Sequence, residues 1–216
     1  MNNNAMFKLG YGLYVITANV NGSKNGCIVN TVIQVTTTPN RIAVTVNKAN
    51  KTHDMIVDSG KFNVSVLSVN APFDLFKHFG FQSGKTVDKF ADFNEAETSA
   101  NNIPYITKGT CAFLSATVYS CVDLGTHTMF IANVTDGEIL NDDEPATYSY
   151  YHQNIKPKPQ AVETKAESAY RCKICGYVHE GELPDDFICP LCKHGAADFF
   201  IASSAILISF IRTISP

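Results

Sequence analysis

Several features that this sequence lacks narrow its class. It has no gathered run of lysines and arginines, and its formal net charge of -3 gives no general attraction to phosphate backbones. Neither the G-x-G-x-x-G motif after a strand nor a G-x-x-x-x-G-K-[ST] loop occurs. The first residues, MNNNAMFKLG, contain no apolar stretch after a basic start, so we expect no secretory signal and a cytoplasmic location. These absences argue against a nucleic-acid-binding protein and a Rossmann fold.

The 7 cysteines do not form a full disulfide framework, because their number is odd. Four of them form two C-x-x-C pairs within one short segment, which predicts metal ligands in a reducing compartment. The other three are isolated among apolar or strand-like neighbours, and we interpret them as small core residues. The predicted metal ligands are Cys172, Cys175, Cys189 and Cys192, and the isolated cysteines are Cys27, Cys111 and Cys121.

Short alternating runs predict a mainly β domain. In RIAVTVN, Ile42, Val44 and Val46 share one face of a strand, and we expect further strands at 62–69, 110–120 and 127–134. Two short helices are expected, from about 52 to 59, entered at Asn50 or Lys51 and ended by Gly60, and from about 71 to 79. Many strands without long crossover helices favour a closed or nearly closed antiparallel barrel.

Changes of composition predict the domain plan. The barrel should occupy residues 1–155, and the Pro-containing, charge-alternating segment 156–169 reads as a linker to a small domain at 170–200. The apolar tail at 201–216 has no assigned role. The apolar stretch 199–214 contains Arg212 and is shorter than the roughly 20 residues that a spanning helix needs, so we expect no membrane anchor.

The cysteine pairs alone predict a tetrahedral four-sulfur site suited to zinc or iron, and a structural zinc ribbon is one reading. The flanking residues are more specific. The patterns Y-x-C-x-x-C-G-Y, from Tyr170, and P-x-D-F-x-C-P-x-C, from Pro184, followed by Phe199, resemble rubredoxin, with the short spacer of rubrerythrin domains. This resemblance implies one iron and single-electron transfer. An acidic excess in 170–199 favours a partner with a basic docking face.

Polar residues crowd predicted strand ends and a helix start, where they fit either ordinary turn and cap chemistry or the binding of a phosphate. They are Asn30, Thr31, Asn47, Lys48, Asn50 and Thr52. The segments around them resemble the flavin reductase-like, FMN-binding split-barrel proteins. The resemblance rests on YGLYVIT (11–17), NGCIVNT (25–31), PNRIAVTVNK (39–48), THDMI (52–56), HFGFQSGK with DKF (78–90) and GTHTMFI (125–131).

This resemblance implies roles for these residues. Asn30 and Thr31 should lie along the isoalloxazine edge, and the stretch from Asn47 through Thr52 should hold the ribityl chain and phosphate. Lys85 and Lys89 should add positive charge there; the alternative is that they belong to a solvated loop or helix face. His127 should lie near the flavin or nicotinamide as the candidate catalytic residue, unless it is a structural histidine. Residues 148–153 should close over the flavin or pack a homodimer, which is the form that the family implies.

Together the two resemblances imply an NAD(P)H-dependent FMN oxidoreductase. It would pass single electrons through a rubredoxin iron to a protein acceptor, expected to be a flavodiiron-type NO or O2 reductase. Two alternatives stay open. One is a flavoredoxin-like carrier that takes electrons from another protein, and the other is an FMN-binding barrel with a structural zinc ribbon.

Overall fold

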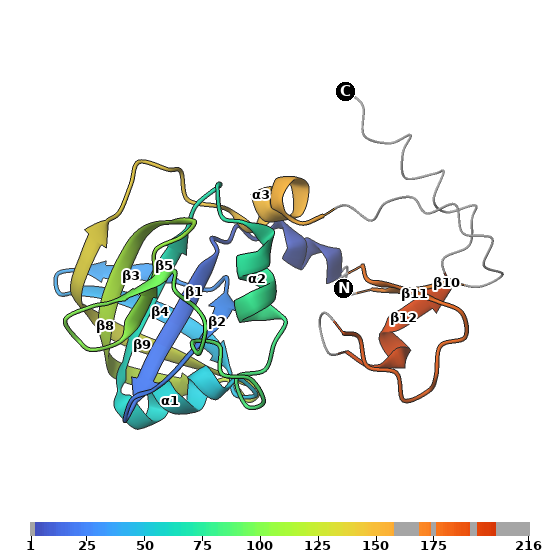
Figure 1. Cartoon of the computed structure of the whole chain (residues 1–216), viewed down its shortest axis with the longest axis horizontal. Helices are drawn as coiled ribbons and strands as arrows, with labels where there is room; N and C mark the ends of the chain where they lie inside the picture. The colour runs from blue at the N-terminus through green and yellow to red at the C-terminus, as the bar shows by residue number, and fades with distance from the viewer. Residues whose placement is uncertain (1–2, 158–168, 174–175, 191–193, 202–216) are drawn as a thin grey trace. The chain divides into compact units, whose positions relative to one another are not determined.

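The structure, a computed structural model, describes residues 3–157, 169–173, 176–190 and 194–201 (Figure 1). The chain divides into two compact units, at 1–158 and 159–216. Most of the predicted linker and all but the first residue of the predicted tail lie outside the described residues. Within the part of the chain that is described, no helix has the length and apolar character needed to cross a bilayer.

The first unit is built on one antiparallel sheet of 7 strands in the order β2-β1-β5-β8-β9-β4-β3. The prediction of a mainly β fold is confirmed. The strands are β1 (Tyr14–Val20), β2 (Ser23–Val29), β3 (Ile33–Thr37), β4 (Asn40–Asn47), β5 (Lys61–Leu67), β8 (Thr110–Asp123) and β9 (His127–Ile139).

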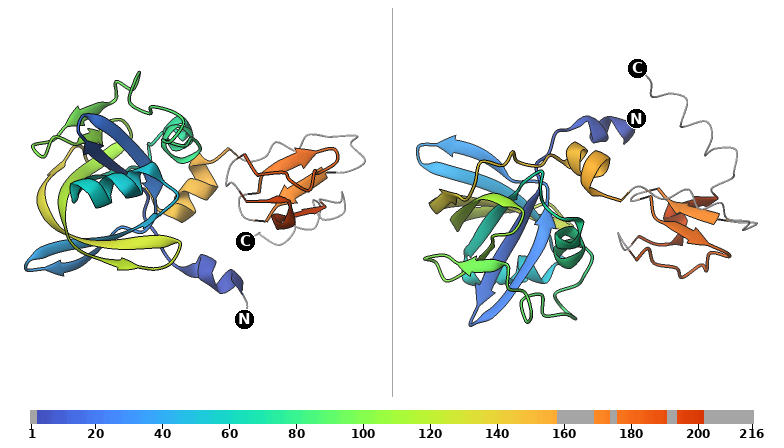
Figure 2. Two further views of the ribbon diagram at one scale, coloured as in Figure 1. Left: turned by 90° about the horizontal axis from the view of Figure 1, so that it is seen from below. Right: turned by 45° about the horizontal axis from the view of Figure 1, so that its top comes forward.

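The connection between β2 and β3 forces this sheet to curl. The two strands stand at opposite edges of the hydrogen-bonded order, yet only residues 30–32 separate them in sequence. Four residue steps reach at most about 15 Å, so the two edges must lie close together. The sheet therefore wraps into a barrel that is split between β2 and β3, and Asn30 and Thr31 lie in the segment that spans the split (Figures 1 and 2).

Alternation along the strands fills the barrel with apolar side chains. Ile42, Val44 and Val46 of β4 all point into this core, as predicted, and meet residues such as Phe62 and Phe130. Helix α1 (Lys51–Ser59) covers one end of the barrel, as the left view of Figure 2 shows. It adds Met55 and Ile56 to the same core.

The ends of α1 follow the sequence prediction. Asn50 is the N-cap, and Gly60 ends the helix in the left-handed region with φ 65°. The second helix, α2 (Phe73–Gly80), begins after Pro72, which has no N–H to lose at a helix start. It packs Leu75, Phe76 and Phe79 against the outer face of the barrel. The remaining elements are η1 (Asn3–Lys8), β6 (Ala96–Thr98), β7 (Pro104–Ile106), α3 (Tyr148–Tyr150) and η2 (Tyr151–Ile155).

Of the three isolated cysteines, Cys27 and Cys111 are buried, as expected. The prediction for Cys121 is wrong, because its side chain is exposed. Strand β5 pairs with β8 only as far as Thr117, and the last residues of β8 pair with β9. The sequence pattern shows that apolar and polar residues alternate along β8, but it does not show where the neighbouring strand ends, and so it did not reveal that Cys121 is exposed.

The second unit holds a small antiparallel sheet in the order β11-β10-β12. Its elements are β10 (Ala169–Cys172), β11 (Val178–Glu180), η3 (Ala196–Asp198) and β12 (Phe199–Ile201). Cys172, Cys189 and Phe199 form its core, with Tyr177 and Phe187 packed against them. So small a core leaves much of the folding free energy to be supplied by a bound metal.

The turn before β8 offers a matched pair of glycine substitutions. Gly109 and Gly60 both have φ +65°, but a Cβ at Gly109 would lie 2.6 Å from the Cα of Ala71, whereas nothing lies within 4 Å at Gly60. We expect Gly60→Ala to lower the free energy of unfolding by about 1 kcal/mol through backbone strain alone. Gly109→Ala should cost about 1–3 kcal/mol more, because the Ala71 backbone must move.

Urea unfolding of the full chain, followed by circular dichroism, measures this difference. Equal losses in the two variants would contradict the close packing of the Gly109 turn on Ala71.

Candidate functional site

Most of the predicted site residues converge where three segments of the barrel meet. Asn47, the last residue of β4, pairs with His127, the first residue of β9. The backbone N–H of Lys48 donates to the carbonyl of Thr126 at 3.0 Å, which joins the β4–α1 turn to the β8–β9 hairpin. The connection that spans the barrel split joins them through Thr31, whose Oγ1 donates to the carbonyl of Thr45 in β4 at 2.8 Å.

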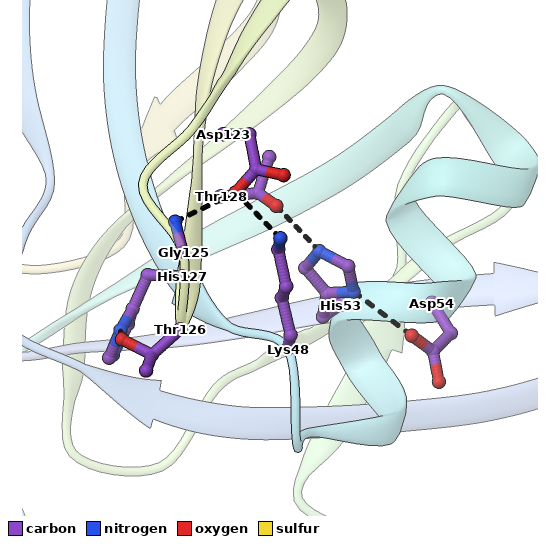
Figure 3. Close-up of polar contacts among 8 residues, drawn as sticks. All are labelled: Lys48, His53, Asp54, Asp123, Gly125, Thr126, His127 and Thr128. Atoms are coloured by element: carbon purple, nitrogen blue, oxygen red, sulfur yellow. Dashed lines mark hydrogen bonds and ion pairs between the residues drawn. The ribbon is translucent and has the colours of Figure 1, made fainter.

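The side chain of Lys48 is held by an ion pair. Its Nζ lies 2.6 Å from Oδ1 of Asp123, at the end of β8 (Figure 3). Lys48 and the N–H of Gly125, which donates to the same carboxylate at 2.8 Å, lower the pKa of Asp123. The Asp123 side chain is exposed and that of Lys48 is half-buried, at 71% and 35% exposure, so this pair stabilises the fold little. The ammonium is therefore available to a stronger anion.

The N-terminus of α1 lies in the same group of residues. The side chain of Asn50 makes no capping hydrogen bond, although Asn50 N donates to the carbonyl of Asn47 at 3.0 Å. The Asn47 side chain instead accepts from the N–H of Ala49 at 2.8 Å. Helix N–H groups that no side chain caps carry partial positive charge at the helix start. With Lys48 beside them, they make this corner of the barrel suited to a phosphate.

Two of the predicted residues have side chains that are buried behind this surface. Thr52 has an exposed fraction of 0%, and its Oγ1 accepts from the side chain of Asn25 at 2.9 Å. Lys89 is 2% exposed and donates to the carbonyls of Gly26 and Phe79, both at 2.9 Å. Burial lowers the pKa of Lys89. Lys85 is exposed on the loop before it. The structure therefore gives Thr52 and Lys89 interior contacts, and a loop pattern cannot reveal that a lysine turns inward.

His127 lies on the outer face of β9, half-buried, with Nδ1 2.8 Å from Oγ1 of Thr126. Its neighbour Thr128 points to the interior, because side chains alternate along a strand. The structure adds a residue that the sequence analysis missed. His53 on α1 is buried with both ring nitrogens paired, one to Asp54 and one to Thr128 (Figure 3). The adjacent His and Asp at the start of a helix were the available signal.

Two hollows of the described structure lie away from these residues. They have volumes of about 290 Å³ and 400 Å³ and are lined by residues around Asn101 and around Gly137. Large apolar side chains are exposed close to the site residues in sequence, and they lie on β3 and the β8–β9 hairpin. They are Ile33, Val35, Tyr119, Val122 and Leu124.

Two of the four predicted metal ligands are described. Cys172 and Cys189 are 1% and 0% exposed and belong to the same core. Gly176 takes φ 77°, and its N–H donates to the carbonyl of Cys172 at 2.9 Å, which closes a tight turn after the first cysteine. Cys175 and Cys192 lie outside the described residues, so no set of three metal-binding side chains can be assembled from those that are described.

Comparison with known proteins gives two family matches. Residues 6–158 match the flavin reductase like domain, and residues 170–200 match the rubredoxin-like domain of rubrerythrin. The flavin reductase PheA2 in its native state is 31% identical, with a TM-score of 0.58 over 68% of this chain and 93% of that one.

Two relatives extend this comparison. High molecular weight rubredoxin of Moorella thermoacetica is 38% identical over 92% of this chain and 99% of its own length. Ferric-chelate reductase (NAD(P)H) of Archaeoglobus fulgidus is 41% identical over 74% of this chain and 94% of its own length. The split barrel, the cysteine pairs and these matches agree: the chain belongs to the flavin reductase like family and carries a rubredoxin-like domain after the barrel.

Proposed function

We propose that this chain is an NAD(P)H-dependent flavin oxidoreductase that binds FMN at the corner formed by the β4–α1 turn and the β8–β9 hairpin. It passes electrons one at a time to a protein acceptor through iron held by its four clustered cysteines. The observation that carries the proposal is the fusion of a flavin reductase like domain and a rubredoxin-like domain in one chain.

The electron count explains why these two domains belong together. A nicotinamide delivers two electrons as a hydride, whereas a one-iron site carries one. A flavin, when bound, supplies the conversion between the two. The cysteine thiolates would hold iron in both its oxidised and its reduced state, and apolar side chains such as Phe187 and Phe199 would limit the access of water to it.

The donor set at the corner fits FMN. Lys48 and the uncapped N–H groups of α1 offer positive charge to the phosphate, and the amides of Asn47 and Asn50 offer partners to the ribityl hydroxyls. Asn30 and Thr31, in the segment that spans the split, are assigned to the isoalloxazine edge. Thr52 and Lys89 bond in the interior to Asn25 and Gly26 of β2, and the exposed Lys85 is assigned to add positive charge for the phosphate.

The residues at this corner have positioning roles. Hydride transfer requires the nicotinamide C4 to stack near the flavin N5, so alignment contributes more than acid–base chemistry. His127, on the outer face of β9, is assigned to orient the nicotinamide or to hold a proton at its ring nitrogen. Its Nδ1 is occupied by Thr126, which leaves Nε2 for the ligand.

A homodimer completes the proposal. Ile33 and Val35 lie exposed on β3, which is an edge strand, and Val122 and Leu124 lie exposed on the hairpin that carries His127. An exposed apolar group of this kind beside an open site is typical of a surface that another chain covers. A second copy of the barrel would enclose the flavin.

The relative from Archaeoglobus favours a second candidate function. Its match covers 160 residues, close to the length of the barrel unit. The barrel would then reduce a ferric chelate directly, without the cysteine cluster.

For the protein acceptor of the main proposal, we propose a flavodiiron-type NO or O2 reductase.

Substitution of the ion pair tests the phosphate assignment. We expect Lys48→Gln to weaken FMN binding about tenfold, because it removes one charge-assisted hydrogen bond. Asp123→Asn should tighten FMN binding about twofold to threefold, since the competing carboxylate loses its charge while its oxygen still accepts from Gly125. Fluorescence titration measures both, with riboflavin as the control ligand because it lacks the phosphate. Equal changes for riboflavin and FMN would show that Lys48 does not bind the phosphate.

Substitution of one metal ligand separates the two redox units. Cys172→Ser should abolish the iron absorbance and the reduction of a protein acceptor, while NADH still reduces the flavin and a ferric chelate at nearly the wild-type rate. Stopped-flow absorbance under anaerobic conditions follows the flavin and iron bands together. If Cys172→Ser lost NADH-driven reduction of the flavin as well as the iron absorbance, the two domains would not be independent. Colourless, zinc-loaded wild-type protein would refute the electron outlet, and flavin that stays oxidised with NADH but not with dithionite would indicate a flavoredoxin-like carrier.

Charge on the edge strand tests the homodimer. We expect Ile33→Lys combined with Val35→Lys to give a monomer and to weaken FMN binding, because two buried ammonium groups would be costly at an apolar interface. Sedimentation velocity gives the oligomeric state. Val57→Lys, at an exposed valine on the outer side of α1, is the matched control and should leave the dimer intact. A wild-type monomer would disprove this part of the proposal.

A further inference from the structure

His53 is a buried imidazole that joins α1 to β9. Its exposed fraction is 8%, and its ring lies against Phe130 at a centroid distance of 5.7 Å. Nδ1 lies 2.9 Å from Oδ1 of Asp54, and Nε2 lies 2.8 Å from Oγ1 of Thr128 (Figure 3). Both nitrogens are thus used in well-formed hydrogen bonds, as burial of polar groups requires, and the two bonds join His53 to Asp54 and to a strand.

The partners assign the protons. An ionised carboxylate only accepts, so Nδ1 carries a hydrogen and donates it to Asp54. In the neutral ring Nε2 then accepts, and the hydroxyl of Thr128 donates to it. The orientation of the Thr128 hydroxyl is therefore set from α1 by way of His53.

The order carboxylate, imidazole, hydroxyl is also that of a nucleophilic triad. Burial excludes this role here, because Thr128 is 7% exposed and belongs to the wall of the barrel. A substrate carbonyl has no approach to its Oγ1. The hydroxyl acts as a connection between two elements.

This connection reaches the hairpin that carries the proposed flavin contacts. Thr128 pairs with Asp123 across the hairpin, and the N–H of Leu124 donates to the carbonyl of His127 at 2.9 Å. Thr128 points inward, whereas His127, the next residue, lies on the outer face of β9. A bond to Thr128 from inside the barrel therefore supports His127 from the opposite face of the strand.

We propose that His53 is a positioning residue: through Thr128 it fixes the β8–β9 hairpin, and with it His127, relative to the N-terminus of α1. These two elements carry the two ends of the proposed FMN site. The effect on turnover rests on the proposed function, whereas the effect on the hairpin can be measured in the protein without ligand.

Two amide substitutions separate the two bonds of the ring. In His53→Asn the side-chain nitrogen can still donate to Asp54 but the amide is too short to reach Thr128. In His53→Gln the longer amide reaches Thr128 and accepts from it. Thr128→Val removes the hydroxyl and keeps the shape of the side chain. Asp58→Asn, at an exposed carboxylate on the same helix, is the control.

Hydrogen–deuterium exchange of the full chain without flavin is the first measurement. We expect His53→Asn and Thr128→Val to speed amide exchange in residues 124–128 about tenfold, since one buried hydrogen bond is lost. His53→Gln should restore protection to within about threefold, and Asp58→Asn should leave it unchanged. The double variant His53→Asn with Thr128→Val should exchange as fast as each single variant, because both substitutions remove the same bond. Unchanged amide exchange at residues 124–128 in a folded Thr128→Val protein would overturn the proposal. This test does not depend on whether His53→Asn folds.

Turnover gives the second measurement. Reduction of bound flavin at saturating NADH should slow about tenfold in Thr128→Val, with the Kd for FMN within about twofold of wild type. If Thr128 only stabilised the fold, its substitution would lower the unfolding midpoint without slowing flavin reduction at an unchanged Kd for FMN. If wild-type protein fails to reduce flavin with NADH, the proposed function fails, while the exchange result still decides the role of His53.

Discussion

The short connection between β2 and β3 is the constraint on which the rest of the barrel depends. Residues 30–32 join the two edges of a sheet of 7 strands, so the sheet must close on itself except at one narrow split. Closure turns one face of every strand into a common interior, which apolar side chains fill. It also brings the ends of β2, β4 and β9 to one corner, although these ends are far apart in sequence.

Helix α1 completes the corner that is proposed to bind the flavin. It covers the end of the barrel with Met55 and Ile56, and its first turn is tied by side chains to two strands. Thr52 bonds to Asn25 of β2, and His53 bonds to Thr128 of β9. Polar groups that are buried here have partners, as the cost of desolvation requires. The helix N-terminus is left uncapped beside Lys48, which is a suitable arrangement for an anionic ligand.

The two units differ in the size of their apolar cores and in what stabilises them. The barrel has a large apolar core and offers a surface where a ligand is oriented, whereas the small unit has a core of Cys172, Cys189 and Phe199. So small a core depends on a bound metal for stability, and under the proposed function the same thiolates make that metal a redox centre. Two such units in one chain then let electrons leave the barrel without a diffusing carrier, which is the physical advantage of the proposed function.

The sequence by itself determined the class of fold, the approximate positions of β4, β5, β8 and β9, the caps of α1 and the cysteine pairs. These features depend on local chemistry: alternation, turn residues and ligand spacing. The tertiary structure decided which polar residues share a surface. Asn47 and His127 pair because β4 and β9 are neighbours, whereas Thr52 and Lys89 turn into the interior and Cys121 is exposed beyond the reach of β5. Burial and pairing depend on neighbours that are distant in sequence. For that reason, the hydrogen bond between His53 and Thr128 forms only when the barrel closes around them.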